Sequence, residues 1–197
     1  MGLLVSINAA EDGDAIYVPA GVYQFSSSFV TTGPFEIKKS ISIIGEEGTV
    51  IKGHYDINSW LKATRVLKID TGLAKNVLLQ NLTFEGTGSM YTGANIYIRN
   101  TKGIGNADEA NVVLKDVKCQ DVRIENGYIG GQTINGTLEN CDIDQFTIGG
   151  WNVDGTPSYS TLTYDESNTI GKLIVDNASV VSLSKINGVV ASHVGEQ

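Results

Sequence analysis

Short apolar segments recur along the chain, each reaching an Asn, Asp or Gly before a second short apolar segment begins. The clearest copies are residues 76–86 (NVLLQNLTFEG), 111–121 (NVVLKDVKCQD), 136–146 (GTLENCDIDQF) and 172–182 (KLIVDNASVVS). Aligned on Asn81, Asp116, Asn140 and Asn177, they recur after 35, 24 and 37 residues. An irregular period within about 20–50 residues is typical of a solenoid, in which each repeat buries its core only against its neighbours.

Each repeat is predicted to contain three strands, with side chains pointing alternately into and out of a coil. First strands are expected near 15–18, 41–44, 76–80, 111–115, 136–139 and 172–176. Second strands are expected near 49–52, 82–85, 117–120, 141–144 and 178–183, and third strands near 35–37, 66–69, 95–99, 122–125, 146–148 and 189–192. The sequence therefore predicts an all-β fold, a parallel β-helix of about six coils in a single domain over residues 1–197.

The composition suits strands and turns, and it excludes some partners. The chain has 197 residues, of which 41% are hydrophobic and 18% charged, with 23 Gly and 3 Pro. Its net charge of −8 disfavours nucleic acid and anionic membrane surfaces, because binding to phosphates depends on Lys and Arg. No apolar run approaches the roughly 20 residues that cross a bilayer. A neutral glycan, or an acidic one bridged by a cation, stays open as a ligand.

Two cysteines, Cys119 and Cys141, are too few for a disulfide framework. In the repeat alignment Cys141 shares an apolar column with Leu82, and Cys119 shares one with Phe84. The favoured interpretation is two buried thiols that act as small hydrophobic side chains. A disulfide between them is the alternative.

Residues 7–25 (INAAEDGDAIYVPAGVYQF) and 35–53 (FEIKKSISIIGEEGTVIKG) resemble the opening of right-handed parallel β-helix proteins of the pectate-lyase-like superfamily. The resemblance implies a right-handed winding, a short capping helix within residues 3–10, and a module of a secreted or cell-surface bacterial protein. The first 14 residues lack the basic segment and cleavage site of a signal peptide. The superfamily includes lyases, hydrolases, esterases and adhesins, so the resemblance does not choose an activity.

Long loops, the longest expected at 149–171, carry aromatic side chains among Asn, Asp and Thr. Such residues suit sugar recognition, because a ring packs against the C–H face of a pyranose while polar groups bind its hydroxyls. The alternative is that rings such as those of Trp60 and Trp151 fold back to cover the coil. The candidate ligand-binding residues are Tyr55, Trp60, Tyr91, Tyr97, Trp151, Asp154, Tyr159 and Tyr164.

Outward positions of the predicted strands form three further columns of interest. On the third strands, Lys68, Tyr97, Arg123 and Thr147 align, and could hold a uronate carboxylate with Tyr97 as a platform; a solvated face is the alternative. The next column, predicted to be a surface salt-bridge ladder, is Asp70, Arg99, Glu125 and Gly149. On the first strands the column is Tyr17, Ser42, Leu78, Val113, Thr137 and Ile174. Exposed Leu78, Val113 and Ile174 indicate a covering loop, a neighbouring domain or self-association.

The sequence contains some of the residue types that a polysaccharide lyase or glycoside hydrolase needs, but does not place them together. Polysaccharide lyases of the superfamily combine Ca²⁺, held by clustered carboxylates, with an Arg or Lys base. Here Asp142 and Asp144 point outward from one second strand near Glu85, and the three are candidate Ca²⁺ ligands. The candidate bases, Lys68 and Arg123, lie on a different face. Asp142 and Asp144 could also form a hydrolytic pair, although two solvated acids are the alternative.

Three hypotheses for function follow. The favoured one is a non-catalytic carbohydrate-binding or adhesion module, because aromatic loops occur without an assembled catalytic site. The second is a polysaccharide lyase or glycoside hydrolase that acts on an acidic polysaccharide. The third is a structural spacer or oligomerisation module. No cofactor is expected, apart from Ca²⁺ if a lyase-like site forms.

Overall fold

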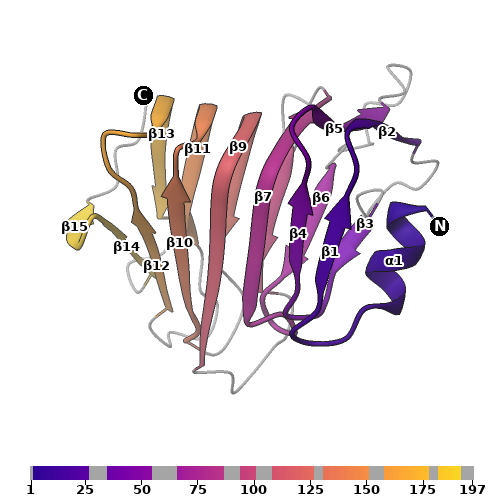
Figure 1. The fold of residues 1–197 in the computed structure, drawn as a ribbon. Helices are drawn as coiled ribbons and strands as arrows, with labels where there is room; N and C mark the ends of the chain where they lie inside the picture. The colour runs from indigo at the N-terminus through magenta and orange to yellow at the C-terminus, as the bar shows by residue number, and fades with distance from the viewer. Residues whose placement is uncertain are drawn as a thin grey trace.

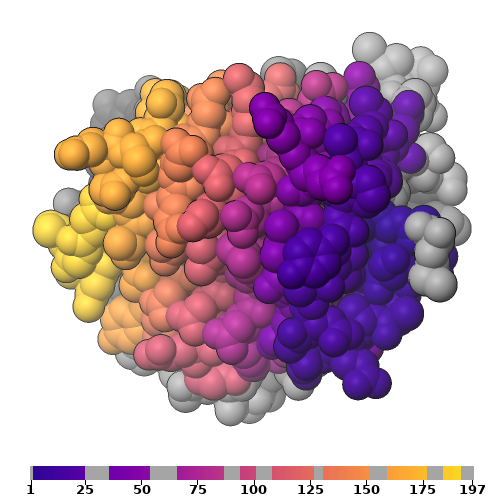
Figure 2. Space-filling model, viewed as in Figure 1, coloured from indigo at the N-terminus to yellow at the C-terminus, as the bar shows by residue number. Residues whose placement is uncertain are grey.

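The computed structural model describes residues 2–26, 35–54, 66–86, 94–100, 108–126, 131–150, 158–177 and 182–191. Within these ranges one helix, α1 (Leu3–Ala9), precedes strands that belong to one continuous sheet wound into a β-solenoid (Figure 1). The coils follow one another as bands from the N-terminal end to the C-terminal end (Figure 2). The prediction of an all-β solenoid is confirmed.

Three faces run along the solenoid, each built from parallel strands. The first face contains β1 (Ala15–Val18), β4 (Ser42–Gly45), the start of β7 (Asn76–Glu85), the start of β9 (Glu109–Glu125), β10 (Thr133–Glu139), β12 (Ser158–Thr163) and β14 (Ser182–Ile186). The second face contains β2 (Gly21–Ser26), β5 (Thr49–His54), the end of β7, the middle of β9, and the starts of β11 (Asp142–Gly150) and β13 (Thr169–Asn177). The third face contains β3 (Phe35–Ile37), β6 (Leu67–Asp70), β8 (Ile96–Arg99) and the ends of β9, β11 and β13. After β14, β15 (Val189–Ala191) turns back antiparallel to it.

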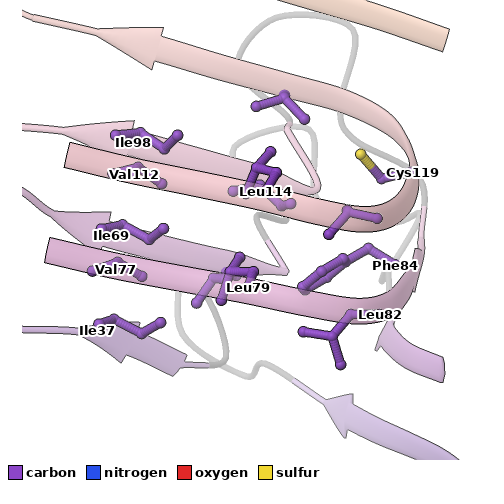
Figure 3. Close-up of a cluster of buried hydrophobic side chains, with 14 of the residues drawn as sticks. Ile37, Ile69, Val77, Leu79, Leu82, Phe84, Ile98, Val112, Leu114 and Cys119 are labelled. Carbon is purple, nitrogen blue, oxygen red and sulfur yellow. The ribbon is translucent and has the colours of Figure 1, made fainter. Parts of the chain in front are cut away.

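Alternate side chains fill the interior of the solenoid with a continuous aliphatic core. Leu79 and Leu114 are in register on the first face, while Phe84 and Cys119 point inward from the second (Figure 3). All four are almost fully buried. Both cysteines are buried and free, which confirms the favoured interpretation. Because no coil encloses an apolar interior alone, its stability depends on the neighbours against which it stacks.

The corner between the first and second faces is formed by residues in the left-handed region. Asn81, Asp116 and Asn140 have φ angles of 53°, 52° and 52°. Asn and Asp tolerate this region better than other residues with a side chain. The amide Nδ2 of Asn140 also donates to Oδ1 of Asp116 at 2.6 Å. The alignment of these three residues is confirmed, and its physical basis is a repeated tight corner.

The C-terminal repeats differ from the prediction. Asn177, aligned in the sequence with Asn140, pairs instead with Gly150 on the third face. The strand that follows β10 on the first face is β12, which lies inside the predicted loop 149–171. Segment 172–176, predicted as a first strand, belongs to the third face. The prediction was wrong because a third strand has the same apolar alternation as a first strand.

The exposed apolar column on the first face is shorter than predicted. Leu78 and Val113 are in register and partly exposed, as expected. However, Ala15 rather than Tyr17 pairs with Ser42. Ile174 pairs with Thr147 on the third face, so its placement beside Leu78 and Val113 was wrong. Self-association through this column stays a prediction from the sequence.

The left-handed corner provides a test of the fold. Asn140→Ala is expected to lower the free energy of unfolding by about 1–2 kcal/mol, because it combines a left-handed backbone with loss of a side-chain hydrogen bond. Asn140→Gly should lose less, since glycine adopts positive φ without strain. Urea unfolding followed by circular dichroism measures both. Equal losses for the two variants would contradict the role assigned to the corner.

Candidate functional site

A pocket of about 570 Å³ lies over the outward side of the second face, across β5, β7, β9 and β11. Its volume falls within the range of roughly 300–1,000 Å³ that is usual for small-molecule sites. The residues that line it are mostly polar: Lys52, Gly53, Thr83, Phe84, Glu85, Gly86, Lys118, Cys119, Gln120 and Asp144. This pocket is the candidate functional site.

Strand register sets the order of side chains along the pocket. Lys52 lies opposite Glu85, and Lys118 lies opposite Asp142. The same pairing of β9 with β11 places Asp144 beside Gln120. Neighbouring strands are about 4.8 Å apart, so the side chains follow one another along the solenoid at this interval. Glu85, Asp142 and Asp144 therefore share one face, as the sequence alignment predicted.

Two ion pairs lie at the pocket, formed by three of its lining residues and by Asp142 of β11. Nζ of Lys52 lies 3.3 Å from Oε2 of Glu85, and Nζ of Lys118 lies 3.0 Å from Oδ2 of Asp142. All four are about half exposed or more, so each pair contributes little to stability. Each lysine nevertheless neutralises the carboxylate that it faces.

Asp144 is exposed and has no ion-pair partner within the described ranges. Residue 120 of β9 lies on one side of it. On the other side is Gly171, where an added Cβ would lie only 2.6 Å from the backbone oxygen of Asp144. The two backbones therefore pack closely at this point, and Gly171 places no side chain of its own beside the Asp144 carboxylate.

Carboxylates shape the electrostatic environment at the base of the pocket. Burial raises the pKa of the Cys119 thiol far above its ordinary value, and the thiol of Cys141 raises it further. The charges of Asp121, Asp144 and Asp142 add to this effect, because each disfavours a second negative charge nearby. These acids therefore disfavour ionisation of the Cys119 thiol in the core beneath the pocket.

Asp121 occupies the corner between the second and third faces. Burial raises the pKa of its carboxyl to about 6, although the charge of Arg123 acts in the opposite direction. Its Oδ1 is buried and has no hydrogen-bond partner among the described residues. The backbone N–H of Asp121 donates to Oδ1 of Asn95 at 3.1 Å, which holds the corner in place. The ionised carboxylate is therefore poorly accommodated in the folded state.

The predicted Ca²⁺ site gains no support from the arrangement of these acids. In the described part of the chain, no group of three or more His, Cys, Asp or Glu side chains is placed to hold a metal ion. Glu85 and Asp142 face lysines instead. A Ca²⁺ role for Glu85, Asp142 and Asp144 stays a prediction.

The two basic candidates lie on the third face and are paired with acids. Nζ of Lys68, whose side chain is 13% exposed, lies 2.6 Å from Oε1 of Glu36. Burial raises the pKa of Glu36, but hydrogen bonds and charges from Lys68 and a neighbouring lysine outweigh it and lower the pKa. Arg123 lies 3.3 Å from Glu125 and 3.4 Å from Asp176. The structure does not bring either base next to Asp142 and Asp144 on the second face.

Tyr97 lies in register between Lys68 and Arg123, as predicted, but its ring is buried. The side chain is 2% exposed, and its hydroxyl donates to Oε2 of Glu125 at 2.8 Å. Arg99 in turn lies 4.0 Å from Glu125, so part of the predicted ladder is present. With its ring inside the protein, Tyr97 has no exposed face on which a sugar could stack.

The predicted aromatic residues do not line the described part of the pocket. Tyr159 belongs to β12, and Tyr164 follows that strand and packs against the core on the first face. The other candidates lie outside the described residues: Tyr55, Trp60, Tyr91, Trp151 and Asp154.

Sequence reasoning did not select Lys52, Thr83, Lys118 and Gln120 as ligand-binding residues. All four are outward positions on predicted second strands, so the alternation pattern contained the signal. The aromatic residues of the loops were the stronger candidates from the sequence, because polar side chains on a strand are usually only solvated.

Comparisons with protein-family models, with curated proteins and with solved structures find no match to this chain. Among the described residues, no helix is long and apolar enough to span a bilayer.

The raised pKa of Asp121 predicts a specific pH dependence of stability. Its folded-state pKa, about 6, lies above the ordinary value of 3.8, so protonation stabilises the fold. That stability is fully present below about pH 4 and is lost as the pH rises through 6. Asp121→Asn should therefore stabilise the protein at pH 7 and flatten the change in urea midpoint between pH 4 and 7. If Asp121→Asn and the exposed control Glu139→Gln gave the same pH profile, this account of Asp121 would fail.

Proposed function

We propose that the chain is a non-catalytic carbohydrate-binding or adhesion module, with the second-face pocket as its binding site. The observation that carries the proposal is the pocket itself, about 570 Å³ in volume and lined by hydroxyl, amide, carboxylate and ammonium groups. Thr83 and Gln120 can each donate and accept hydrogen bonds, while Asp144 accepts them. Sugar hydroxyls need this mixture of donors and acceptors.

The shape of the site supports a linear ligand. The polar side chains repeat along the solenoid at about 4.8 Å intervals, so an extended polymer could contact successive strands. Gly53 and Gly86 bring the backbone to the surface of the pocket, where a Cβ on Gly86 would lie 3.2 Å from the backbone oxygen of Gly53. The strands pack closely at this point, and neither glycine adds a side chain to the pocket.

The proposal includes a finer architecture and a location. We infer a right-handed winding of about six coils with α1 as the cap, as in the pectate-lyase-like superfamily, in a secreted or cell-surface protein. Burial of Leu3 and Ile7 of α1 in the core supports the capping role. The strands on each of the three faces support the coil number.

Mutation of the pocket tests the proposal. A glycan array probed with the purified chain should give a hit that persists when Ca²⁺ is chelated. Gln120→Ala should weaken binding of that glycan about three- to tenfold, the effect of one lost hydrogen bond. The matched control is Gln80→Ala on the first face, which should bind normally. Absence of any glycan hit, or equal losses for Gln80→Ala and Gln120→Ala, would contradict the proposal.

The spacing of Glu85 and Asp144 favours glycoside hydrolysis as a second candidate function. The two residues lie two strands apart, so their backbones are separated by roughly 10 Å. Inverting glycosidases hold their carboxyl groups about 6.5–9.5 Å apart, one to protonate the glycosidic oxygen and the other to activate water.

Hydrolysis would be detected as reducing sugar released from a bound polysaccharide. Glu85→Gln and Asp144→Asn should each abolish the release, whereas Glu139→Gln on the first face should not. A glycan that is bound tightly but never cleaved would rule out this second candidate and leave the binding module.

A further inference from the structure

We propose that the ligand of the second-face pocket carries a free, positively charged amino group, as in an amino-sugar polymer, and that Asp144 binds this group. The inference rests on the carbohydrate-binding function proposed above and narrows the class of sugar. It departs from the acidic polysaccharide that the sequence suggested. Its basis is the balance of charge among the side chains of the pocket.

Both lysines at the pocket already form ion pairs with acidic side chains. Lys52 faces Glu85 at 3.3 Å, and Lys118 faces Asp142 at 3.0 Å. A uronate carboxylate would have to compete with these acids for the two ammonium groups. Asp144 is the charged group lining the pocket that has no opposite charge beside it among the described residues.

The position of Asp144 leaves its carboxylate available to a ligand. The side chain is exposed at the pocket, and Gly171 on the next strand offers no side chain that could cover or pair with it. Gln120, on the preceding strand, supplies an amide that can bind a neighbouring hydroxyl. One carboxylate beside one amide suits a sugar unit with an amino group next to a hydroxyl group.

The surrounding field also favours a cation. Asp144 lines the pocket with its carboxylate exposed, and Asp121 and Asp142 lie on the same pair of strands. The chain as a whole carries a net charge of −8. The overall negative charge attracts a ligand ammonium group and repels a uronate.

The charge on the amino group distinguishes two closely related sugars. A free amine is protonated and donates three charge-assisted hydrogen bonds, which an aspartate can accept. Acetylation of the same nitrogen removes the charge and leaves one amide N–H, while the rest of the sugar is unchanged. Glucosamine and N-acetylglucosamine oligomers of equal length therefore isolate the contribution of the charge.

Isothermal titration of the full chain with these two hexasaccharides, at pH 6 and low salt, tests the proposal. The glucosamine hexamer should bind about two- to fivefold more tightly, the factor expected from one partly exposed ion pair. The preference should shrink as salt is added. Asp144→Asn should abolish the preference but retain binding of the acetylated hexamer. Glu139→Gln, which removes an exposed carboxylate from the first face, should keep the preference.

The outcomes separate this inference from the function on which it rests. Equal affinity for the two hexamers, with both weakened by Gln120→Ala, would overturn the amino-sugar inference and leave carbohydrate binding intact. Tighter binding of a galacturonate hexamer than of the glucosamine hexamer would also overturn it. A preference lost equally in Asp144→Asn and Glu139→Gln would show a general charge effect and overturn the role of Asp144. Failure to bind any of the three oligomers would overturn both proposals.

Discussion

Stacking of parallel strands in fixed register is the constraint on which the rest of the structure depends. Each coil buries its apolar interior only by stacking on the next coil. Leu79 and Leu114 must therefore lie in register on neighbouring coils. The left-handed corners at Asn81, Asp116 and Asn140 keep the strands in step. Because alternate residues point outward, the same register arranges polar side chains in ordered columns over the second face.

The sequence predicted those parts of the fold that depend on local pattern. The corner residues and the strands around Asp116 could be found because a tight left-handed turn needs particular residue types. Asn177 was misplaced because apolar alternation is the same on every face and does not say which face a strand joins. The site was harder to predict, since Lys52 and Asp144 line one pocket only because strands distant in the sequence pair with one another.

The ligand preference proposed for the pocket depends on which of its charged side chains have an oppositely charged partner. Lys52 and Lys118 are held by acids on the next strand, an arrangement that a solenoid produces whenever opposite charges share a column. Gly171 follows Asp144 in the same column and has no side chain with which that carboxylate could pair. The proposed selection of a cationic ligand rests on this one carboxylate, which lacks the partner that the other acids of the column have.

The central claim, that the second face binds a carbohydrate, is tested most directly by mapping amide chemical shifts in a ¹⁵N-labelled chain titrated with the glucosamine hexamer. The account predicts saturable shifts concentrated at residues of the second-face strands, including Thr83, Gln120 and Asp144. Residues of the first face, such as Gln80 and Glu139, should be unaffected. Shifts confined to the first or third face would contradict it, as would the absence of shifts with millimolar glucosamine, N-acetylglucosamine and galacturonate hexamers alike.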